Sequence, residues 1–319
     1  MALFDTFKAY GPVPSRRLGM SLGINNIPAK VCTYACIYCQ VGRTTMMTKN
    51  RDEFYDPQKI VKAVKRKLAK ALESGVQADY LTFVPDGEPT LDINLGKAID
   101  LLKPLGVPIG VISNSSLLWR EDVRQELAKA DWVSLKVDAM EDRTWRRINR
   151  PEAYLQHFSI QSGMQEFARH FSGRLVTETM LIKDLNDDDD QLGHMADFIA
   201  ELKPHTAYIG IPIRPPVEKW AHRPDEDRLN QAFQIYSDKL AKVEYLIGYE
   251  GNAFAYTGNA QKDLLSITAV HPMRKSAVEK LLSKAGEPWA LVDHLIAAGN
   301  IKESIYEGHA YYLRTFEQT

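Results

Sequence analysis

The chain has 319 residues, of which 45% are hydrophobic, and its 40 basic and 41 acidic residues leave a formal net charge of −1. This length allows one large core and a small appended unit. The balanced charge gives no bulk attraction to nucleic acid or to an anionic membrane. No apolar run of signal-peptide length opens the chain, and none approaches the roughly 20 residues of a membrane span. We therefore expect a soluble, cytoplasmic protein without membrane association.

Strand and helix patterns alternate through most of the chain. Apolar positions that recur every third or fourth residue predict helices at 58–74, 92–103, 120–128, 153–169 and 188–202. Short apolar runs predict strands near 18–25 and at 79–85, 107–113, 131–137, 174–182 and 206–213. This order favours an α/β fold, a partial (β/α)6 barrel of six parallel strands with helices outside. Active sites of such folds lie at the carboxyl ends of the strands.

The last part of the chain has a different pattern. Helices are predicted from Pro272 to near Gly286 and from Pro288 to near Gly299. Two apolar strands flanking residues 307–309 then indicate a hairpin, with strand ranges of 301–306 and 310–316.

Two helices followed by a hairpin suggest a small α+β, winged-helix-like unit. We place it at 256–319, after a barrel core with an N-terminal extension at 1–255. A helical cap that only closes the barrel is the alternative. Six basic and six acidic residues between 269 and 319 give this unit no strong phosphate-binding face.

All three cysteines of the chain, Cys32, Cys36 and Cys39, lie in one short segment. Disulfide scaffolds need paired cysteines spread through the fold, so this grouping indicates metal binding in a reducing compartment. Three thiolates can each bind one iron of a cubane cluster, leaving the fourth iron open to a small molecule. A structural zinc ion with a histidine ligand is an alternative, although the nearest histidine in sequence is His157. Unliganded buried cysteines are a second alternative.

The CxxxCxxC spacing, with Tyr38 just before the last cysteine, resembles the signature of the radical S-adenosylmethionine (SAM) superfamily. The flanking residues 11–25 and 39–44 are similar to a subgroup related to the tRNA wyosine-base synthases, and the resemblance covers residues 10–216. It implies a radical SAM-type barrel with one [4Fe–4S] cluster on Cys32, Cys36 and Cys39. SAM would chelate the open iron, and an electron donor such as flavodoxin or ferredoxin would reduce the cluster.

The resemblance also implies which residues contact SAM. Asp86–Thr90 directly follows a predicted strand and is similar to a glycine–glutamate motif that holds the SAM ammonium group. The implied SAM contacts are Tyr38, Gly87, Glu88, Ser113, Asn114, Ser134 and Lys136. Each has a structural alternative: a tight turn at 86–90, a helix cap at 113–115 and an internal ion pair for Lys136.

Four residues are candidates for substrate contacts: Arg16, Arg17, Asp138 and Arg214. The arginines at 16 and 17 precede the cysteines in sequence, and Arg214 ends the last predicted core strand. Their guanidinium groups suit phosphate or carboxylate. The alternatives are that they offset the negative charge of the cluster or hold a loop in place.

Wyosine-base synthases carry further cysteines for a second cluster, and this chain has none. We therefore expect it not to perform that reaction. No GxGxxG motif follows a strand, and no P-loop occurs. The sequence predicts a radical SAM enzyme that abstracts hydrogen from an unidentified substrate, with RNA or a nucleotide favoured. The rival hypothesis is a metal-binding regulatory or nucleic-acid-binding protein with a structural metal site.

Overall fold

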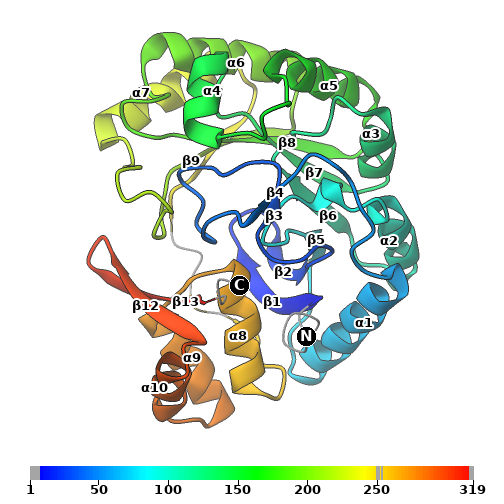
Figure 1. The fold of residues 1–319 in the computed structure, drawn as a ribbon, viewed down its shortest axis with the longest axis vertical. Coiled ribbons are helices and arrows are strands. Elements are labelled where there is room, and N and C mark those ends of the chain that lie inside the picture. Colours follow the sequence, from blue (N-terminus) through cyan, green and yellow to red (C-terminus); the bar gives the residue numbers. More distant parts are fainter. Residues whose placement is uncertain (1–7, 249–251, 253, 316–319) are drawn as a thin grey trace.

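The computed structural model describes residues 8–248, 252 and 254–315, and its centre is an open, curled sheet of eight strands (Figure 1). Their spatial order is β1 (Ala9–Ser15), β2 (Gly19–Ile24), β5 (Tyr80–Phe83), β6 (Ile109–Ser113), β7 (Trp132–Lys136), β8 (Arg174–Met180), β9 (Thr206–Gly210) and β10 (Val243–Leu246). All neighbours in the sheet are parallel except β1, which runs antiparallel to β2. The parallel strands therefore end at one common edge.

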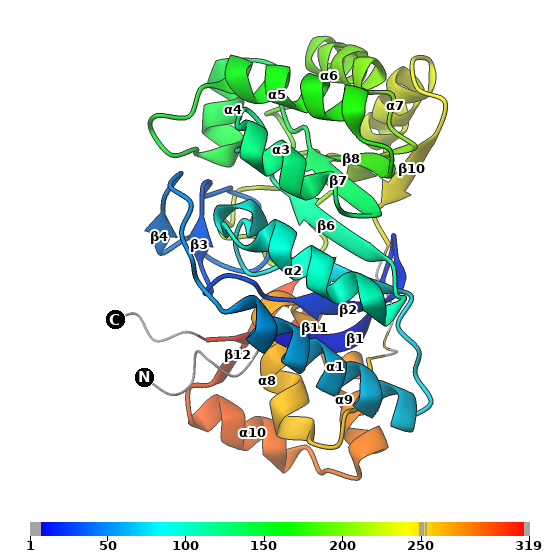
Figure 2. The same ribbon diagram turned by 90° about the vertical axis from the view of Figure 1, so that its right-hand side faces the viewer.

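Helices cover the outer face of the sheet (Figures 1 and 2). They are α1 (Pro57–Glu73), α2 (Leu95–Leu102), α3 (Glu121–Leu127), α4 (Asp142–Asn149), α5 (His157–His170), α6 (Asp189–Leu202) and α7 (Glu226–Ser237). Single 3₁₀ turns occupy Pro89–Leu91 and Lys103–Leu105. Helix α1 illustrates how the sequence sets these boundaries: Asp56 accepts a hydrogen bond from the Gln58 amide, and Pro57 occupies the first turn.

The expected partial barrel is confirmed, with two strands more than the six predicted. Strand β1 adds an antiparallel edge, and β10 extends the other edge in parallel to β9. Helices α4 and α7 were also not expected. Strand β1 was missed because the chain at 9–15 carries two prolines and a glycine, which weaken a strand pattern.

Alternation along the strands separates two apolar regions. Val133 and Ala207 belong to the main core between the sheet and its helices. Their neighbours Trp132 and Tyr208 point to the opposite, inner face, where they pack in a second cluster with Leu18, Val176 and Leu246. Polar residues that follow Trp132 at every second position therefore also face the inside of the barrel.

The C-terminal region forms a unit beside β1 (Figures 1 and 2). Its elements are α8 (Ala260–Val270), β11 (Met273–Arg274), α9 (Lys275–Ala285), α10 (Ala290–Ala297), β12 (Ile301–Tyr306) and β13 (His309–Arg314). The three strands form one antiparallel sheet in the order β11-β13-β12. The predicted helix pair and hairpin are present, and the part of the expected second strand beyond Thr315 lies outside the described residues.

Two features of this unit differ from the predicted elements. Helix α8 precedes the predicted pair, and α9 begins at Lys275 rather than at Pro272, because Met273 and Arg274 pair with β13. The order of elements agrees with the winged-helix-like interpretation, which remains a prediction, as does the boundary at residue 255. The apolar core of the unit includes Tyr10 and Val13 from β1, so the unit shares a core with the barrel edge.

Two helical glycines have opposite surroundings and give a test of the packing. A Cβ at Gly163 in α5 would lie 2.3 Å from the carbonyl oxygen of Leu118, whereas a Cβ at Gly193 in α6 would meet nothing closer than 3.9 Å. We expect Gly163→Ala to lower the free energy of unfolding by about 1–3 kcal/mol through overpacking. Gly193→Ala should raise it by up to about 1 kcal/mol through helix propensity. Urea denaturation measures both, and equal effects would contradict the packing of α5 on residues 118–119.

Candidate active site

The cysteine segment begins as a short strand on the carboxyl edge of β5. Strand β3 (Val31–Cys32), which pairs with β4 (Met46–Met47), also forms a bridge to Gly87. The Lys30 amide donates to the Asp86 carbonyl at 2.7 Å, and the Glu88 amide donates to the Val31 carbonyl at 3.2 Å. A Cβ at Gly87 would lie only 2.0 Å from the Val31 oxygen. This close approach therefore requires glycine.

The remainder of the cysteine segment is held by two further parts of the chain. The Ile37 amide donates to the carbonyl of Ile148, near the end of α4, at 2.9 Å. The segment that follows β9 contributes two more bonds, from the Val217 amide to the Cys39 carbonyl at 3.1 Å and from the Glu218 amide to the Ile37 carbonyl at 3.0 Å. Backbone bonds from three separate regions thus fix the segment at the carboxyl end of the barrel.

The three thiols are half-buried, and amide groups approach two of them. Asn114 Nδ2 lies 3.5 Å from Cys32 Sγ, and Asn149 Nδ2 lies 3.5 Å from Cys36 Sγ. Burial, with a contribution from the other cysteines, raises the pKa of Cys32 well above its ordinary value. Burial, with a contribution from Asp138, raises the pKa of Cys36 to about 12. The free thiols are therefore protonated at neutral pH, and a bound metal would favour the thiolates.

This donor set fits a cubane iron–sulfur cluster. Within the described residues, no three His, Cys, Asp or Glu side chains converge closely enough to hold one metal ion. A cubane instead presents its irons at separate corners, one thiolate to each. The asparagine N–H groups can donate to negatively charged sulfur. Three thiols and these amides suit a cluster with one ligand position left open.

Glu88 is buried, and its carboxylate organises the predicted SAM-binding residues. It accepts hydrogen bonds from Ser113 Oγ at 2.8 Å and from the Asn114 amide at 2.7 Å. It also accepts from the amide and hydroxyl of Thr90. Burial raises the pKa of Glu88, while these donors oppose the rise. Glu88 thereby brings the ends of β5 and β6 together beneath the cysteine segment.

Tyr38 and Asp138 form a second buried group. Asp138 accepts from the Tyr38 hydroxyl, from Asn149 Nδ2 at 2.8 Å and from the Met180 amide at 2.8 Å. Burial, with the nearby Asp138, raises the pKa of Tyr38 well above its ordinary value. Asp138, expected as a substrate contact, thus has three protein donors and orients Tyr38 beside Cys36.

Glu178 on β8 connects three of the predicted site residues, Arg17, Ser134 and Lys136. Its carboxylate accepts from Ser134 Oγ at 2.7 Å and pairs with Arg17 at 2.6 Å and Lys136 at 3.7 Å. Burial alone would raise the pKa of Glu178, but the charges of Arg17 and Lys136 outweigh it and lower the pKa. The internal ion pair considered for Lys136 is present. Arg16 lies nearby and donates to the Leu246 carbonyl.

Arg214 lies apart from this group. It is buried where the segment after β9 meets the C-terminal unit, with Nη2 2.7 Å from His271 Nε2.

The predicted site residues fall into two groups in the structure. One group lies at the cysteine segment and comprises the cysteines, Tyr38, Gly87, Glu88, Asn114 and Asp138. The other group, Arg17, Ser134 and Lys136, surrounds Glu178 inside the barrel. Sequence reasoning missed Glu178 and Asn149. Alternation along β8 could have indicated the first, because Val176, Glu178 and Met180 share one face.

Removal of the Glu178 charge tests this interior group. Glu178→Gln leaves Arg17 and Lys136 poorly compensated, so we expect a loss of about 3 kcal/mol in unfolding free energy at pH 7. Because the folded pKa lies below the unfolded value of about 4.3, the difference from wild type should shrink as pH falls through the folded pKa.

Glu166→Gln, which removes the exposed partner of Arg169, is the matched control. It should cost less than about 1 kcal/mol. Equal losses for the two variants in urea denaturation at pH 7 would contradict the buried charge group.

Comparisons with known proteins agree with this architecture. A UPF0026 protein of Methanocaldococcus jannaschii is 42% identical over 97% of this chain and 96% of its own length. An S-adenosylmethionine-dependent nucleotide dehydratase of Flammeovirga pacifica is 24% identical over 68% of this chain and 71% of its own. A structure of TYW1 with a lysine–pyruvate adduct superposes with a TM-score of 0.53 at 17% identity, covering 69% of this chain and 74% of that one.

The profile of the Radical SAM superfamily matches residues 26–198, which include the cysteine segment and strands β5 to β8. Members of this family use a [4Fe–4S] cluster and SAM. The resemblance inferred from CxxxCxxC is thus confirmed. In the described part of the chain, no helix is both long and apolar enough to cross a membrane. With more than half of its length matched, and with the geometry of its cysteine segment, this chain belongs to the radical SAM superfamily of enzymes.

Proposed function

We propose that the chain is a one-cluster radical SAM enzyme, in which Cys32, Cys36 and Cys39 hold a [4Fe–4S] cluster. When bound and reduced, this cluster would supply the electron that cleaves SAM to methionine and a 5′-deoxyadenosyl radical, which takes hydrogen from the substrate. The observation that carries the proposal is the placement of three half-buried thiols on one loop at the carboxyl edge of the barrel. The chain has no other cysteine for a second cluster.

The chain's own residues would prepare this site in three ways. Asn114 and Asn149 donate toward the sulfurs of Cys32 and Cys36 and would stabilise negative charge there. Glu88 holds Ser113 and Asn114, and Gly87 allows the close approach of β3. We assign to Gly87, Ser113 and Asn114 the backbone and polar contacts with SAM, and to Glu88 their positioning.

Positive charge inside the barrel would orient the SAM carboxylate. Lys136 and Arg17 face a single carboxylate, Glu178, so the group carries net positive charge. The Lys136 ammonium also lies 5.3 Å from the centroid of the Tyr38 ring. Tyr38 directly precedes Cys39 in the sequence. We therefore assign the SAM carboxylate to Lys136, with Ser134 and Glu178 holding its side chain.

An apolar cluster beside the cysteines would exclude water from the reaction. Ile37 and Tyr38 pack there with Ile148, Ile182, Leu185 and Ala221. A carbon radical needs such shielding, because an open site exposes it to side reactions. Reduction requires an external donor, for which flavodoxin or ferredoxin remains our expectation. RNA or a nucleotide remains the favoured substrate class, and the name of the Flammeovirga pacifica relative is in keeping with it.

Metal analysis with SAM turnover tests this function. Anaerobically reconstituted protein should contain about four irons and four sulfides and should form 5′-deoxyadenosine from SAM and a reductant. Cys36→Ala should lose the cluster and the product, while its circular dichroism shows whether the fold remains. Stoichiometric zinc in anaerobically purified protein, or no 5′-deoxyadenosine from a full cluster, would contradict the proposal.

Asn149→Ala tests the amide contact with Cys36. Loss of an N–H donor near sulfur disfavours the more negative, reduced cluster, so we expect a lower reduction potential at unchanged iron content. Asn94→Ala is the matched control, because the Asn94 side chain makes no capping hydrogen bond. A redox titration followed by electron paramagnetic resonance measures both variants. An unchanged potential in Asn149→Ala with a complete cluster would refute the contact.

A further inference from the structure

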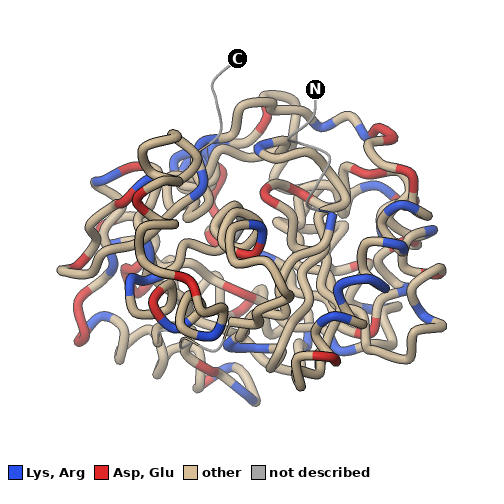
Figure 3. Tube along the Cα trace, turned by 90° about the horizontal axis from the view of Figure 1, so that it is seen from below, with Lys and Arg blue, Asp and Glu red and all other residues tan. Residues whose placement is uncertain are grey.

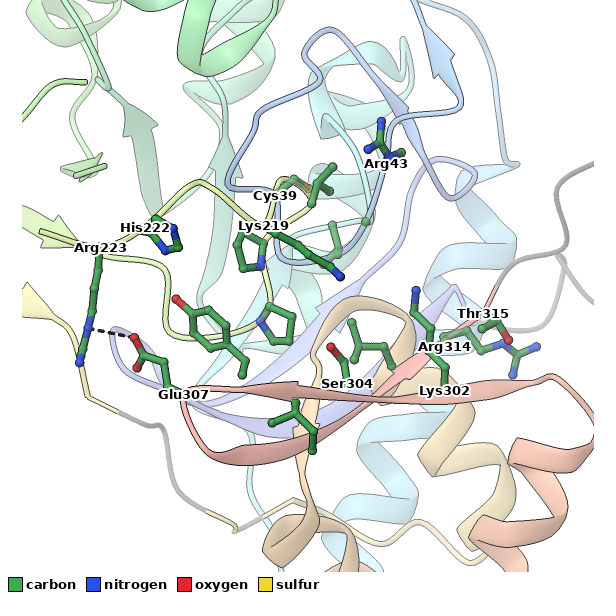
Figure 4. Close-up of a pocket in the computed structure, with 18 of the residues that line it drawn as sticks. Cys39, Arg43, Lys219, His222, Arg223, Lys302, Ser304, Glu307, Arg314 and Thr315 are labelled. Atoms are coloured by element: carbon green, nitrogen blue, oxygen red, sulfur yellow. Dashed lines mark ion pairs between the residues drawn. The ribbon is translucent and has the colours of Figure 1, made fainter. Parts of the chain in front are cut away.

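A large cleft opens directly beside the cysteine segment. Its volume is about 1220 Å³, and its walls come from Cys39–Thr45, from residues 215–223 and from the β12–β13 hairpin. Figure 4 shows Cys39 and Arg43 on one side of this space and the hairpin on the other, with Lys219 extending between them. The C-terminal unit thus forms one wall of a cleft that includes a candidate cluster ligand.

The hairpin is fixed in this position by two tyrosine hydroxyls. Tyr306 donates to the Pro212 carbonyl at 3.0 Å, and Tyr311 donates to the Ile213 carbonyl at 2.8 Å. Both acceptors lie just beyond the end of β9, at the edge of the barrel where the cysteines lie. The wall is therefore preformed, as is usual for ligand sites.

The lining of the cleft is strongly basic. Among its residues are seven lysines or arginines and two carboxylates, although the whole chain is nearly neutral. Seen from below, basic and acidic positions are both spread along the trace (Figure 3), and helix α1 is a second basic segment. The basic side chains of the cleft are Lys30, Arg43, Lys183, Lys219, Arg223, Lys302 and Arg314.

Four of these cations already have carboxylate partners. Arg223 pairs with Glu307 at 2.9 Å (Figure 4), and Lys30 pairs with Asp86. Arg43 lies 3.5 Å from Glu218, and Lys183 lies 3.7 Å from Asp225. These pairs leave three cations, each from a different segment, for an external anion.

Lys219, Lys302 and Arg314 have no carboxylate within ion-pair distance among residues 8–248, 252 and 254–315. The Nη1 atom of Arg314 is buried and has no hydrogen-bond partner there. Burial lowers the pKa of this guanidinium, because water no longer fully stabilises its charge. A buried donor without a partner is costly, so an anion bound here would relieve that cost.

We propose that this cleft is the substrate site and binds the phosphate groups of a nucleotide-type substrate through Lys219, Lys302 and Arg314. The proposal rests on the proposed function, because it takes Cys39 as a ligand of the reacting cluster. A phosphate monoester carries more than one negative charge near neutral pH, and a strand carries one on each phosphodiester. Either matches several cations better than a single carboxylate does. The volume exceeds that of most small-molecule pockets, leaving room for a nucleotide or the end of a strand.

Binding measurements on the reconstituted holoenzyme test this proposal. The probes are uridine, UMP and a single-stranded RNA of 12 uridylates, titrated at low salt and again at higher salt. The test variant is Lys219→Gln with Lys302→Gln, and both side chains are exposed, so the fold should be retained. The matched control is Lys262→Gln with Lys280→Gln, which removes two exposed lysines of the C-terminal unit outside the cleft.

We expect UMP or the RNA to bind while uridine does not, and the test variant to bind about tenfold more weakly than the control variant. For the RNA, the salt dependence of log K should fall by about one unit for each removed contact. UMP binding as tightly as RNA would identify a free nucleotide as the source of the phosphate, and RNA binding alone would identify a strand.

Equal binding by the two variants, or no preference for the phosphate-bearing probes over uridine, would overturn the proposal. These readouts do not depend on SAM cleavage. If phosphate binding fails while 5′-deoxyadenosine still forms, only the substrate assignment is lost. If binding holds and cleavage fails, the proposed function is lost instead.

Discussion

The close backbone contact between Val31 and Gly87 is the constraint on which the site depends. Absence of a side chain at Gly87 lets β3 pair with the chain leaving β5, and this pairing fixes the start of the cysteine segment. The residues on either side of Gly87 have different structural roles. Asp86 pairs with Lys30, while Glu88 turns inward to hold Ser113 and Asn114. One short segment thus connects the cysteines to the ends of two barrel strands.

Two buried carboxylates, Asp138 and Glu178, hold side chains in place inside the barrel. Asp138 orients Tyr38 and Asn149 beside Cys36. Glu178 accepts a hydrogen bond from Ser134 and forms ion pairs with Lys136 and Arg17. Such groups are stable inside a protein only when their hydrogen bonds and charges are satisfied together. Most of the polar residues that face the inside of the barrel therefore position other residues, and only a few are left exposed enough to touch a ligand.

The sequence was most informative where a pattern reflects a local physical requirement. Cysteine spacing predicted the superfamily and strand–helix alternation predicted the barrel, because both patterns depend on neighbouring residues. The roles of Arg17 and Asp138 could not be predicted from local patterns. Arg17 pairs with a residue 161 positions away, and the donors to Asp138 lie 100, 42 and 11 positions away. The basic cleft was missed for the same reason. From 269 to 319, six basic residues are balanced by six acidic ones, so the composition does not show that Lys302 and Arg314 line one cleft with Lys219.

In the proposed enzyme, three thiolates would leave one iron of a [4Fe–4S] cluster open for SAM. Electron–nuclear double resonance on the reduced protein, with SAM labelled by ¹⁵N at its amino group, tests this most directly. We predict a [4Fe–4S]⁺ signal coupled to the labelled nitrogen, because the amino group would bind the open iron. A cluster signal without that coupling, at saturating SAM, would contradict the account.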